Sequence, residues 1–173
     1  MGTTARILDS TLESADIVEN ATLESARRAG FYGTVLEQIG LAVHEIAINA
    51  IIHGNRLNSQ KKVIVTIART RNQLTVTVCD QGNGFDLDRM PDPRSPEALL
   101  RESGRGIYLA RAFMDEFHVQ TKAGVGTTVT LVKIYFVSVC YHRDRWAAFW
   151  DTTNYRSLRS AAQAHNVIQP RYV

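Results

Sequence analysis

Residues 39–52 constrain the fold more than any other part of the sequence, because nearly every position among them is apolar. A helix that is apolar around most of its circumference has to be buried, so this one is expected to lie deep against a sheet. A capping pattern at residues 34–37 predicts where the helix begins, and Gly54 predicts that it stops just after His53. The sequence therefore predicts a domain built around one buried helix.

The remaining strands and helices are predicted from short periodic patterns along the chain. No long helical crossover separates the later strands, so a mainly antiparallel sheet with helices on one face is the economical arrangement. The predicted fold is thus an α+β two-layer sandwich. In chain order its other elements are a strand at residues 5–8, a helix opened by a capping pattern at 10–13 and closed by Gly30, a hairpin of strands at 63–67 and 74–78, a helix at 106–114, and a hairpin of strands at 117–120 and 128–132.

The bulk composition excludes several classes of protein. The chain has 173 residues and a formal net charge of only +3, and its basic residues are scattered, so no nucleic-acid partner is expected. No apolar signal core stands near Met1, and the apolar run at 131–141 is too short for a membrane span. Cys79 and Cys140 lack the spacing of metal ligands and are predicted to be free thiols. A cytoplasmic protein without a membrane partner is the expectation.

Two polar residues interrupt the buried helix and are candidates for chemistry. Glu45 and Asn49 are four residues apart, so both project from one face of the helix. A carboxylate and an amide in such a place need polar partners. Glu45 could act as a general base or orient water, and Asn49 could supply an oxygen ligand to Mg²⁺. The alternative is structural, with Glu45 at a helix edge and Asn49 bonded to the next loop.

Two glycine-rich segments follow, Asp80-Gln81-Gly82-Asn83-Gly84-Phe85 and Gly104-Arg105-Gly106. The first places a carboxylate at the end of a predicted strand, beside backbone that has no side chains. Such a carboxylate can accept a hydrogen bond from a base, and the bare backbone admits a flat or anionic ligand. Taken alone these glycines are equally compatible with ordinary turns and helix starts.

Together with residues 45–54 and Gly126-Thr127-Thr128, these segments resemble four sequence motifs of one family in order and spacing. The family is the GHKL ATPases, which includes gyrase, the heat-shock chaperone, histidine kinases and MutL. The Glu-x-x-x-Asn-x-x-x-His-Gly form and the short domain are most similar to the bacterial anti-sigma-factor serine kinases. The resemblance extends over residues 5–133 and implies the Bergerat-type ATP-binding fold.

At the adenine end of the site, the resemblance implies roles for residues of the first glycine segment. Asp80 would accept the exocyclic amine of adenine, and Thr127 would support that contact. Gly82 and Gly84 would shape the floor of the nucleotide pocket. In this family the loop at residues 86–103 acts as a lid over ATP.

At the phosphate end, the resemblance implies a second set of roles. Asn49 would hold the Mg²⁺ that bridges the phosphates. Gly104, Arg105 and Gly106 would meet the phosphates at the start of a helix, where free amides and the helix dipole favour anions. Arg105 could add charge near the γ-phosphate, and Glu45 would help to activate the attacking hydroxyl.

The implied activity is that of an ATP-dependent protein serine/threonine kinase that is also an anti-sigma factor. Its substrate would be a STAS-domain antagonist protein, its second partner a sigma factor, and a homodimer is expected from the family. The alternative is a non-catalytic module in which ATP binding switches the affinity for a partner. A sensor histidine kinase is disfavoured, because no predicted dimerisation helix with a phosphoacceptor histidine precedes the domain.

The resemblance stops after Lys133, which divides the chain into an ATP-binding domain at 1–133 and an extension at 134–173. Both tryptophans, Trp146 and Trp150, lie in the extension. It could be a docking element that covers a sheet or dimer surface. It could also be a non-native addition, such as a frame-shifted gene end, and its unpatterned sequence slightly favours this second possibility.

Overall fold

The alternating segments of the sequence form a sheet of five strands in the order β1-β2-β3-β5-β4, with every neighbouring pair antiparallel. The computed structural model describes residues 1–84, 105–122 and 124–135. These residues belong to the first of two units into which the chain divides, Met1–Val137 and Ser138–Val173. The strands are β1 (Gly2–Asp9), β2 (Lys62–Arg69), β3 (Gln73–Cys79), β4 (Glu116–Lys122) and β5 (Gly126–Ile134).

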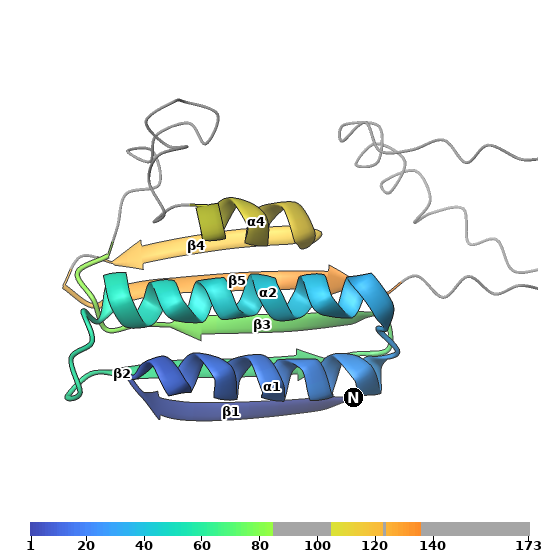
Figure 1. The fold of residues 1–173 in the computed structure, drawn as a ribbon, viewed down its shortest axis with the longest axis horizontal. Helices are drawn as coiled ribbons and strands as arrows, with labels where there is room; N and C mark the ends of the chain where they lie inside the picture. Colours follow the sequence, from blue (N-terminus) through green and yellow to red (C-terminus); the bar gives the residue numbers. More distant parts are fainter. Residues whose placement is uncertain (85–104, 123, 136–173) are drawn as a thin grey trace, which may run out of the picture. The chain divides into compact units, whose positions relative to one another are not determined.

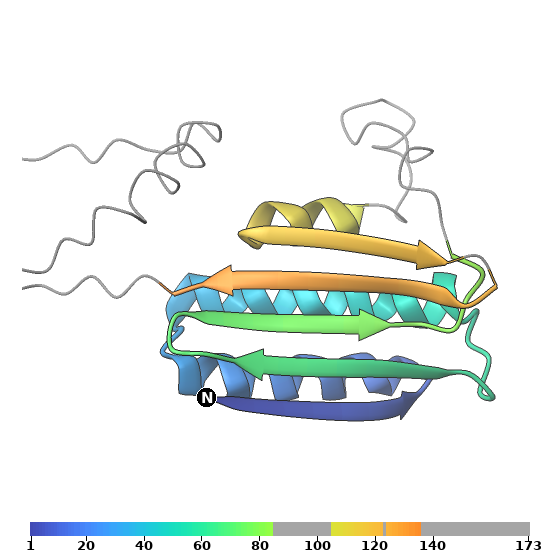
Figure 2. The ribbon, with the colours of Figure 1, turned by 180° about the vertical axis from the view of Figure 1, so that it is seen from behind.

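All helices of the described part lie on the same face of this sheet (Figures 1 and 2). They are α1 (Leu12–Ala29), α2 (Gly33–Asn49), the π-helical turn η1 (Ala50–Gly54) that continues α2, and α4 (Arg105–Phe113). Helix α2 runs between α1 and α4 along the middle of the sheet (Figure 1). The predicted α+β two-layer arrangement, with helices on one face of an antiparallel sheet, is therefore confirmed.

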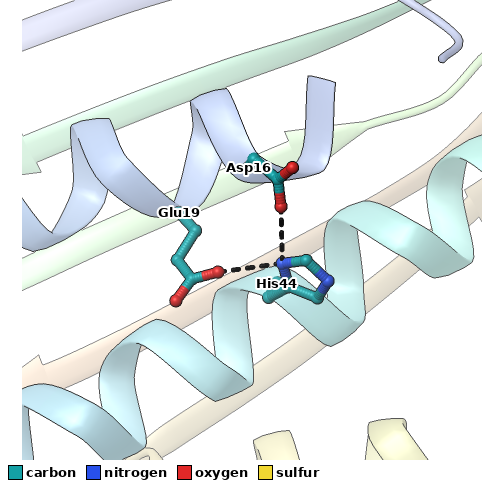
Figure 3. Close-up of side chains that lie close together, drawn as sticks. All are labelled: Asp16, Glu19 and His44. Atoms are coloured by element: carbon teal, nitrogen blue, oxygen red, sulfur yellow. Dashed lines mark ion pairs between the residues drawn. The ribbon is translucent and has the colours of Figure 1, made fainter. Parts of the chain in front are cut away.

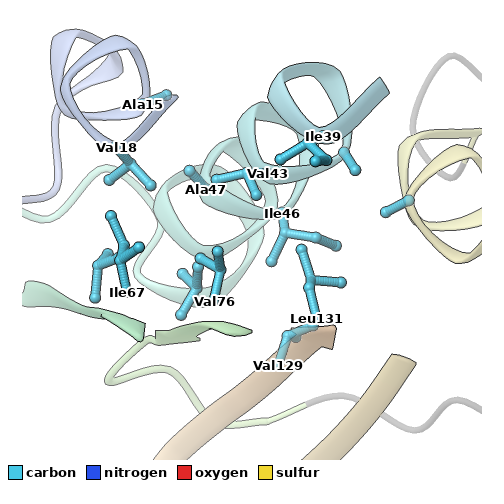
Figure 4. Packing of buried hydrophobic residues seen from close by; sticks show 14 of the residues in the cluster. Ala15, Val18, Ile39, Val43, Ile46, Ala47, Ile67, Val76, Val129 and Leu131 are labelled. Carbon is cyan, nitrogen blue, oxygen red and sulfur yellow. The ribbon is translucent and has the colours of Figure 1, made fainter. Parts of the chain in front are cut away.

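The core lies between α2 and the middle strands. Ile39, Val43 and Ile46 are fully buried on the inner side of α2 and pack over strand residues such as Val76 and Leu131 (Figure 4). Full burial of a valine or isoleucine side chain stabilises a fold by about 1.5–3 kcal/mol, so the residues of this layer contribute to the stability of the domain.

By length and composition, one helical stretch of the described residues could also cross a membrane. It is Gly33–Gly54, 22 residues with a mean hydropathy of 1.5. Many of its apolar side chains, such as Ile39, Val43 and Ile46, are buried in the core, while Leu41 is exposed.

The helices begin close to the two predicted capping patterns, at Leu12 and Gly33, but neither start has a capping side-chain hydrogen bond. The N-cap of α1 is Thr11, without a capping side-chain bond, and that of α2 is Tyr32, also without one. Ser10 is buried, and its hydroxyl donates to the carbonyl of Lys61 at 3.0 Å instead. The Ser10 hydroxyl therefore bonds to the residue before β2 and does not cap α1.

The opposite face of the sheet carries no helix among the described residues (Figure 2). Thr66, Thr77 and Thr130 lie side by side on adjacent strands of this face, and the hydroxyls of Thr77 and Thr130 are 3.3 Å apart. Cys79 is a free thiol here, with Sγ 3.3 Å from the Thr128 hydroxyl. Small polar side chains therefore line the middle of the uncovered face, and the exposed Ile7 and Ile64 lie opposite each other on β1 and β2.

Candidate functional site

Asp80 is the first residue after β3, and its carboxylate is held by backbone groups. Its Oδ1 accepts hydrogen bonds from the Gly82 amide at 2.7 Å and from the Thr127 amide at 3.1 Å. The Asp80 amide donates to the carbonyl of Thr127 at 2.9 Å. No described residue donates a hydrogen bond to Oδ2. One carboxylate oxygen therefore fixes the side chain, and the other can accept a hydrogen bond from a ligand.

Backbone from three segments closes around this carboxylate. A Cβ atom built on Gly54 would lie 2.4 Å from Asp80 Cγ, and one built on Gly126 would lie 2.0 Å from the Asp80 carbonyl oxygen. One built on Gly82 would lie 2.3 Å from the carbonyl oxygen of Gly54. No side chain fits at these positions, so main chain alone forms this wall of the site. Gly84, at φ +79°, packs against the methyl group of Thr121.

The close approach of Gly54 to Asp80 depends on how α2 ends. The helix finishes in the π turn η1, in which the Asn55 amide donates to the carbonyl of Ala50 at 2.8 Å. Arg56 and Leu57 then adopt left-handed conformations, with φ of 58° and 54°. Short π segments inside helices are frequent at functional sites. Here the π turn ends at the residue that touches Asp80.

Asn55 supports the loop after Asp80, and it was not predicted as part of the site. It is 1 % exposed. Its Nδ2 donates to the hydroxyl of Ser10 at 2.7 Å and to the carbonyl of Lys62 at 2.9 Å, while its Oδ1 accepts from the Gln81 amide at 2.8 Å. In the sequence, the supporting role of Asn55 is indicated only by its place after Gly54, which ends the helix. An asparagine at such a position more often belongs to a turn.

The hydroxyl of Thr127 is a buried polar group without a partner. Thr127 is 2 % exposed, and its Oγ1 has no hydrogen bond in the described structure. An unsatisfied buried hydroxyl costs about 1–3 kcal/mol, and such groups are normally satisfied by water or a ligand. The Thr127 amide donates to Asp80 Oδ1, so the Thr127 hydroxyl and the Asp80 carboxylate belong to one small polar patch.

Glu45 and Asn49 lie further along α2, and the start of α4 packs against Glu45. A Cβ atom on Gly106 would lie 2.0 Å from Glu45 Oε2. The positive end of the α4 dipole favours a carboxylate there. Both Glu45 and Asn49 are half-buried, and neither side chain is hydrogen bonded to a described residue. Their oxygens are therefore available to a ligand or an ion.

The helix α2–η1 connects these two groups of residues. Asp80 contacts it at Gly54, α4 contacts it at Glu45, and Asn49 lies between these points. Nine residues of helix correspond to about 13 Å. The arrangement is an elongated site with a carboxylate and a buried hydroxyl at one end and a helix N-terminus at the other.

Several predicted positions are not described at this site. Gly104 and the predicted lid at 86–103 lie outside the described residues. Arg105 is the first residue of α4, and only its backbone is described.

A family model described as the histidine kinase-like ATPase domain matches residues 8–133. Two curated relatives align over much of the same region. The serine-protein kinase RsbW of Bacillus licheniformis is 35% identical over 112 residues, which is 61% of this chain and 70% of the relative. The anti-sigma F factor of Bacillus cereus is 31% identical over 132 residues, which is 70% of this chain and 89% of the relative.

A solved structure shares the fold. It contains the RsbU and RsbW domains of a Mycobacterium tuberculosis protein and superposes with a TM-score of 0.56 at 23% sequence identity. The match covers 78% of this chain but only 32% of that chain. At this identity, the likeness supports the arrangement of strands and helices alone.

Proposed function

The chain belongs to the histidine kinase-like ATPase domain family, and from this premise we propose that it is an ATP-binding protein serine/threonine kinase that acts as an anti-sigma factor. Its phosphoryl acceptor is a STAS-domain antagonist, and its second partner is a sigma factor. The names of the relatives support this class, since they include serine-protein kinases and an anti-sigma factor.

The observation that carries the proposal is the pairing of Asp80 with Thr127. Their backbones are hydrogen bonded, Asp80 Oδ2 has no donor among the described residues, and the Thr127 hydroxyl is buried without a partner. A ring with an exocyclic amine fits these groups, because it supplies a donor to the carboxylate. The glycines let main chain pack directly around Asp80, so this wall carries no side chain. Adenine has such an amine, whereas guanine has a carbonyl oxygen at the equivalent ring position.

The phosphate end would be formed by the residues around Glu45. We propose that the Asn49 amide oxygen is a ligand of Mg²⁺, and that the α4 N-terminus with Gly104, Arg105 and Gly106 binds the phosphates. Bound Mg²⁺–ATP supplies a transferable γ-phosphoryl group. Glu45 accepts the proton of the attacking serine or threonine hydroxyl, and Arg105 adds positive charge near the γ-phosphate.

Gly82 and Gly84 belong to the nucleotide end of this proposal, as the residues that shape the pocket floor. Residues 1–133 are proposed as the ATP-binding domain and residues 134–173 as a separate extension. The remaining parts of the proposal are a cytoplasmic location, a possible homodimer, and no direct contact with nucleic acid or membrane. The net charge of +3 and its scattered basic residues are consistent with the absence of a nucleic-acid partner.

A phosphoryl-transfer assay tests the activity. The full-length chain is incubated with γ-labelled ATP, Mg²⁺ and a STAS-domain substrate, and the label on the substrate is measured. Glu45→Gln keeps the size of the side chain but removes the base, so transfer should fall by about 10²–10⁴-fold. Glu37→Gln is the matched control, because Glu37 lies two turns earlier on the same helix and is exposed.

The outcomes separate the proposal from its alternative. Label transfer that depends on Glu45 but not on Glu37 supports the kinase. ATP binding without any transfer, combined with a partner affinity that changes with ATP, identifies a nucleotide-gated binding module instead. Absence of ATP binding would overturn both.

A further inference from the structure

A second group of chemically active side chains lies away from the candidate nucleotide site, between α1 and α2. Asp16 and Glu19 are three residues apart on α1, and His44 faces them from α2 (Figure 3). His44 Nδ1 is 2.9 Å from Glu19 Oε2 and 3.8 Å from Asp16 Oδ1. One donor atom from each of the three residues lies within 4.8 Å of the others. The cluster thus joins the two long helices.

The contact between His44 and Glu19 is short but is not a hydrogen bond. His44 Nδ1 is buried and has no hydrogen-bond partner, although Glu19 Oε2 is 2.9 Å away. Two ligands of one metal ion show this relationship. With metal–ligand bonds of about 2.0–2.2 Å and ligand–metal–ligand angles of about 90–110°, neighbouring ligand atoms are about 2.8–3.6 Å apart and point at the ion rather than at each other.

We propose that Asp16, Glu19 and His44 bind a single divalent transition-metal ion, with Zn²⁺ as the ion of choice. An imidazole nitrogen and carboxylate oxygens are zinc ligands, and three protein ligands leave a fourth position for water. The imidazole favours Zn²⁺ over Mg²⁺ or Ca²⁺, which prefer oxygen ligands alone. The Asp16 side chain is 69% exposed, so the ion can enter from solvent.

Such an ion would connect α1 to α2 without entering the nucleotide site. His44 points toward α1, whereas its neighbour Glu45 contacts Gly106 of α4. Because α2 also carries Asn49, a metal at His44 would fix the helix that positions the proposed phosphate end. The alternative is that His44 only contacts the two carboxylates without an ion, and it predicts no response to zinc.

The test is zinc binding by the full-length chain, stripped with EDTA and free of nucleotide. Calorimetry and the melting temperature are measured with ZnCl₂ and, separately, with MgCl₂. Zinc is expected to bind at the cluster and raise the melting temperature, and magnesium is not. His44→Gln and Glu19→Gln should each weaken that binding by at least about tenfold. Asp16→Asn alters an exposed position, so it tests the site with little risk to folding.

His118→Gln is the matched control. His118 Nε2 lies 3.2 Å from Glu116 Oε2, an exposed histidine–carboxylate pair outside the cluster of three ligands. Zinc affinity should be unchanged in this variant. Zinc binding that survives His44→Gln in full, or is lost in His118→Gln, overturns the proposal. The proposal is also overturned if zinc does not bind the wild-type chain and His44→Gln nevertheless lowers the melting temperature. That result would identify contacts of His44 with the carboxylates alone.

Discussion

The backbone of Gly54 lies directly against the carboxylate of Asp80, so close that a Cβ atom on the glycine would be 2.4 Å from Asp80 Cγ and 2.6 Å from Oδ2. This contact joins the end of η1 to the end of β3. Gly54 at the end of η1 therefore fixes the position of Asp80 Oδ2, the oxygen without a donor among the described residues. Any side chain at residue 54 would displace the group that is proposed to bind the base.

Gly54→Ala should lower both stability and nucleotide affinity. The added methyl group has no room, and overpacking of this kind costs about 1–3 kcal/mol. Because the clash is with Asp80 itself, ATP affinity should fall at the same time, as measured by calorimetry beside urea unfolding. Gly2→Ala is the control, since the nearest atom to a Cβ there is 3.7 Å away. Normal ATP binding by Gly54→Ala would contradict the proposed site.

Asp80→Asn should change the choice of base rather than the fold. The amide oxygen can still accept from Gly82 and Thr127, but the second position becomes a donor that faces the adenine amine. Loss of a hydrogen bond to a charged group, about 1.5–3 kcal/mol, corresponds to ATP binding weaker by about 10–150-fold. The discrimination against GTP should shrink in the same variant.

Asp9→Asn is the matched control for this experiment, because Asp9 also ends a strand but pairs with Lys62 at an exposed position. Its ATP affinity should equal that of the wild type. Equal loss in both variants would indicate a general charge effect and not a base contact.

Thr127→Val should lower the ATP affinity without lowering the free energy of unfolding. The valine removes a buried hydroxyl that has no partner, so the free energy of unfolding should stay the same or rise by about 1 kcal/mol. ATP affinity should fall severalfold if the hydroxyl supports the base contact. Thr128→Val is the control, since Thr128 is the next residue of β5 and lies on the opposite face, beside Cys79. A Thr127→Val chain that binds ATP normally would remove this residue from the site.

The sequence predicted the elements of the fold better than the connections between them. Periodic apolar residues depend on local geometry, so the hairpins, the buried α2 and the α+β class are confirmed. The positions of the helix starts also agree with the sequence, but the predicted capping bonds do not form, because the buried Ser10 donates to Lys61 across the fold and not to its own helix. The contact of Gly54 with Asp80 and the role of Asn55 could not be predicted, since both depend on the π turn at the end of α2. A single sequence carries no signal for that turn.

Asn55→Ala should be among the most destabilising single changes near the site. It removes the partner of the Gln81 amide and of the Lys62 carbonyl in a position that is 1 % exposed. Each buried group left without a partner costs about 1–3 kcal/mol, so urea unfolding should show a loss of about 2–4 kcal/mol. Asn58→Ala is the control, because Asn58 is exposed and its side chain accepts a single hydrogen bond, from the Gln60 amide two residues later. Equal stability of the two variants would contradict the structural role of Asn55.

Truncation tests the proposed division of the chain. β5 ends at Ile134, whose amide donates to Asp115 Oδ2 at 2.6 Å, and the next ring, that of Tyr135, packs edge-on against Phe31 with centroids 5.4 Å apart. A chain ending at Lys133 loses both contacts, so it should be about 1–3 kcal/mol less stable to urea than one ending at Val137. Eight residues of strand, about 27 Å, separate Ile134 from the Gly126 end of β5. The ATP affinity of the folded protein should therefore be the same for the chain ending at Lys133 and the chain ending at Val137. Loss of ATP binding on truncation at Val137 would instead show that the nucleotide site requires residues 138–173.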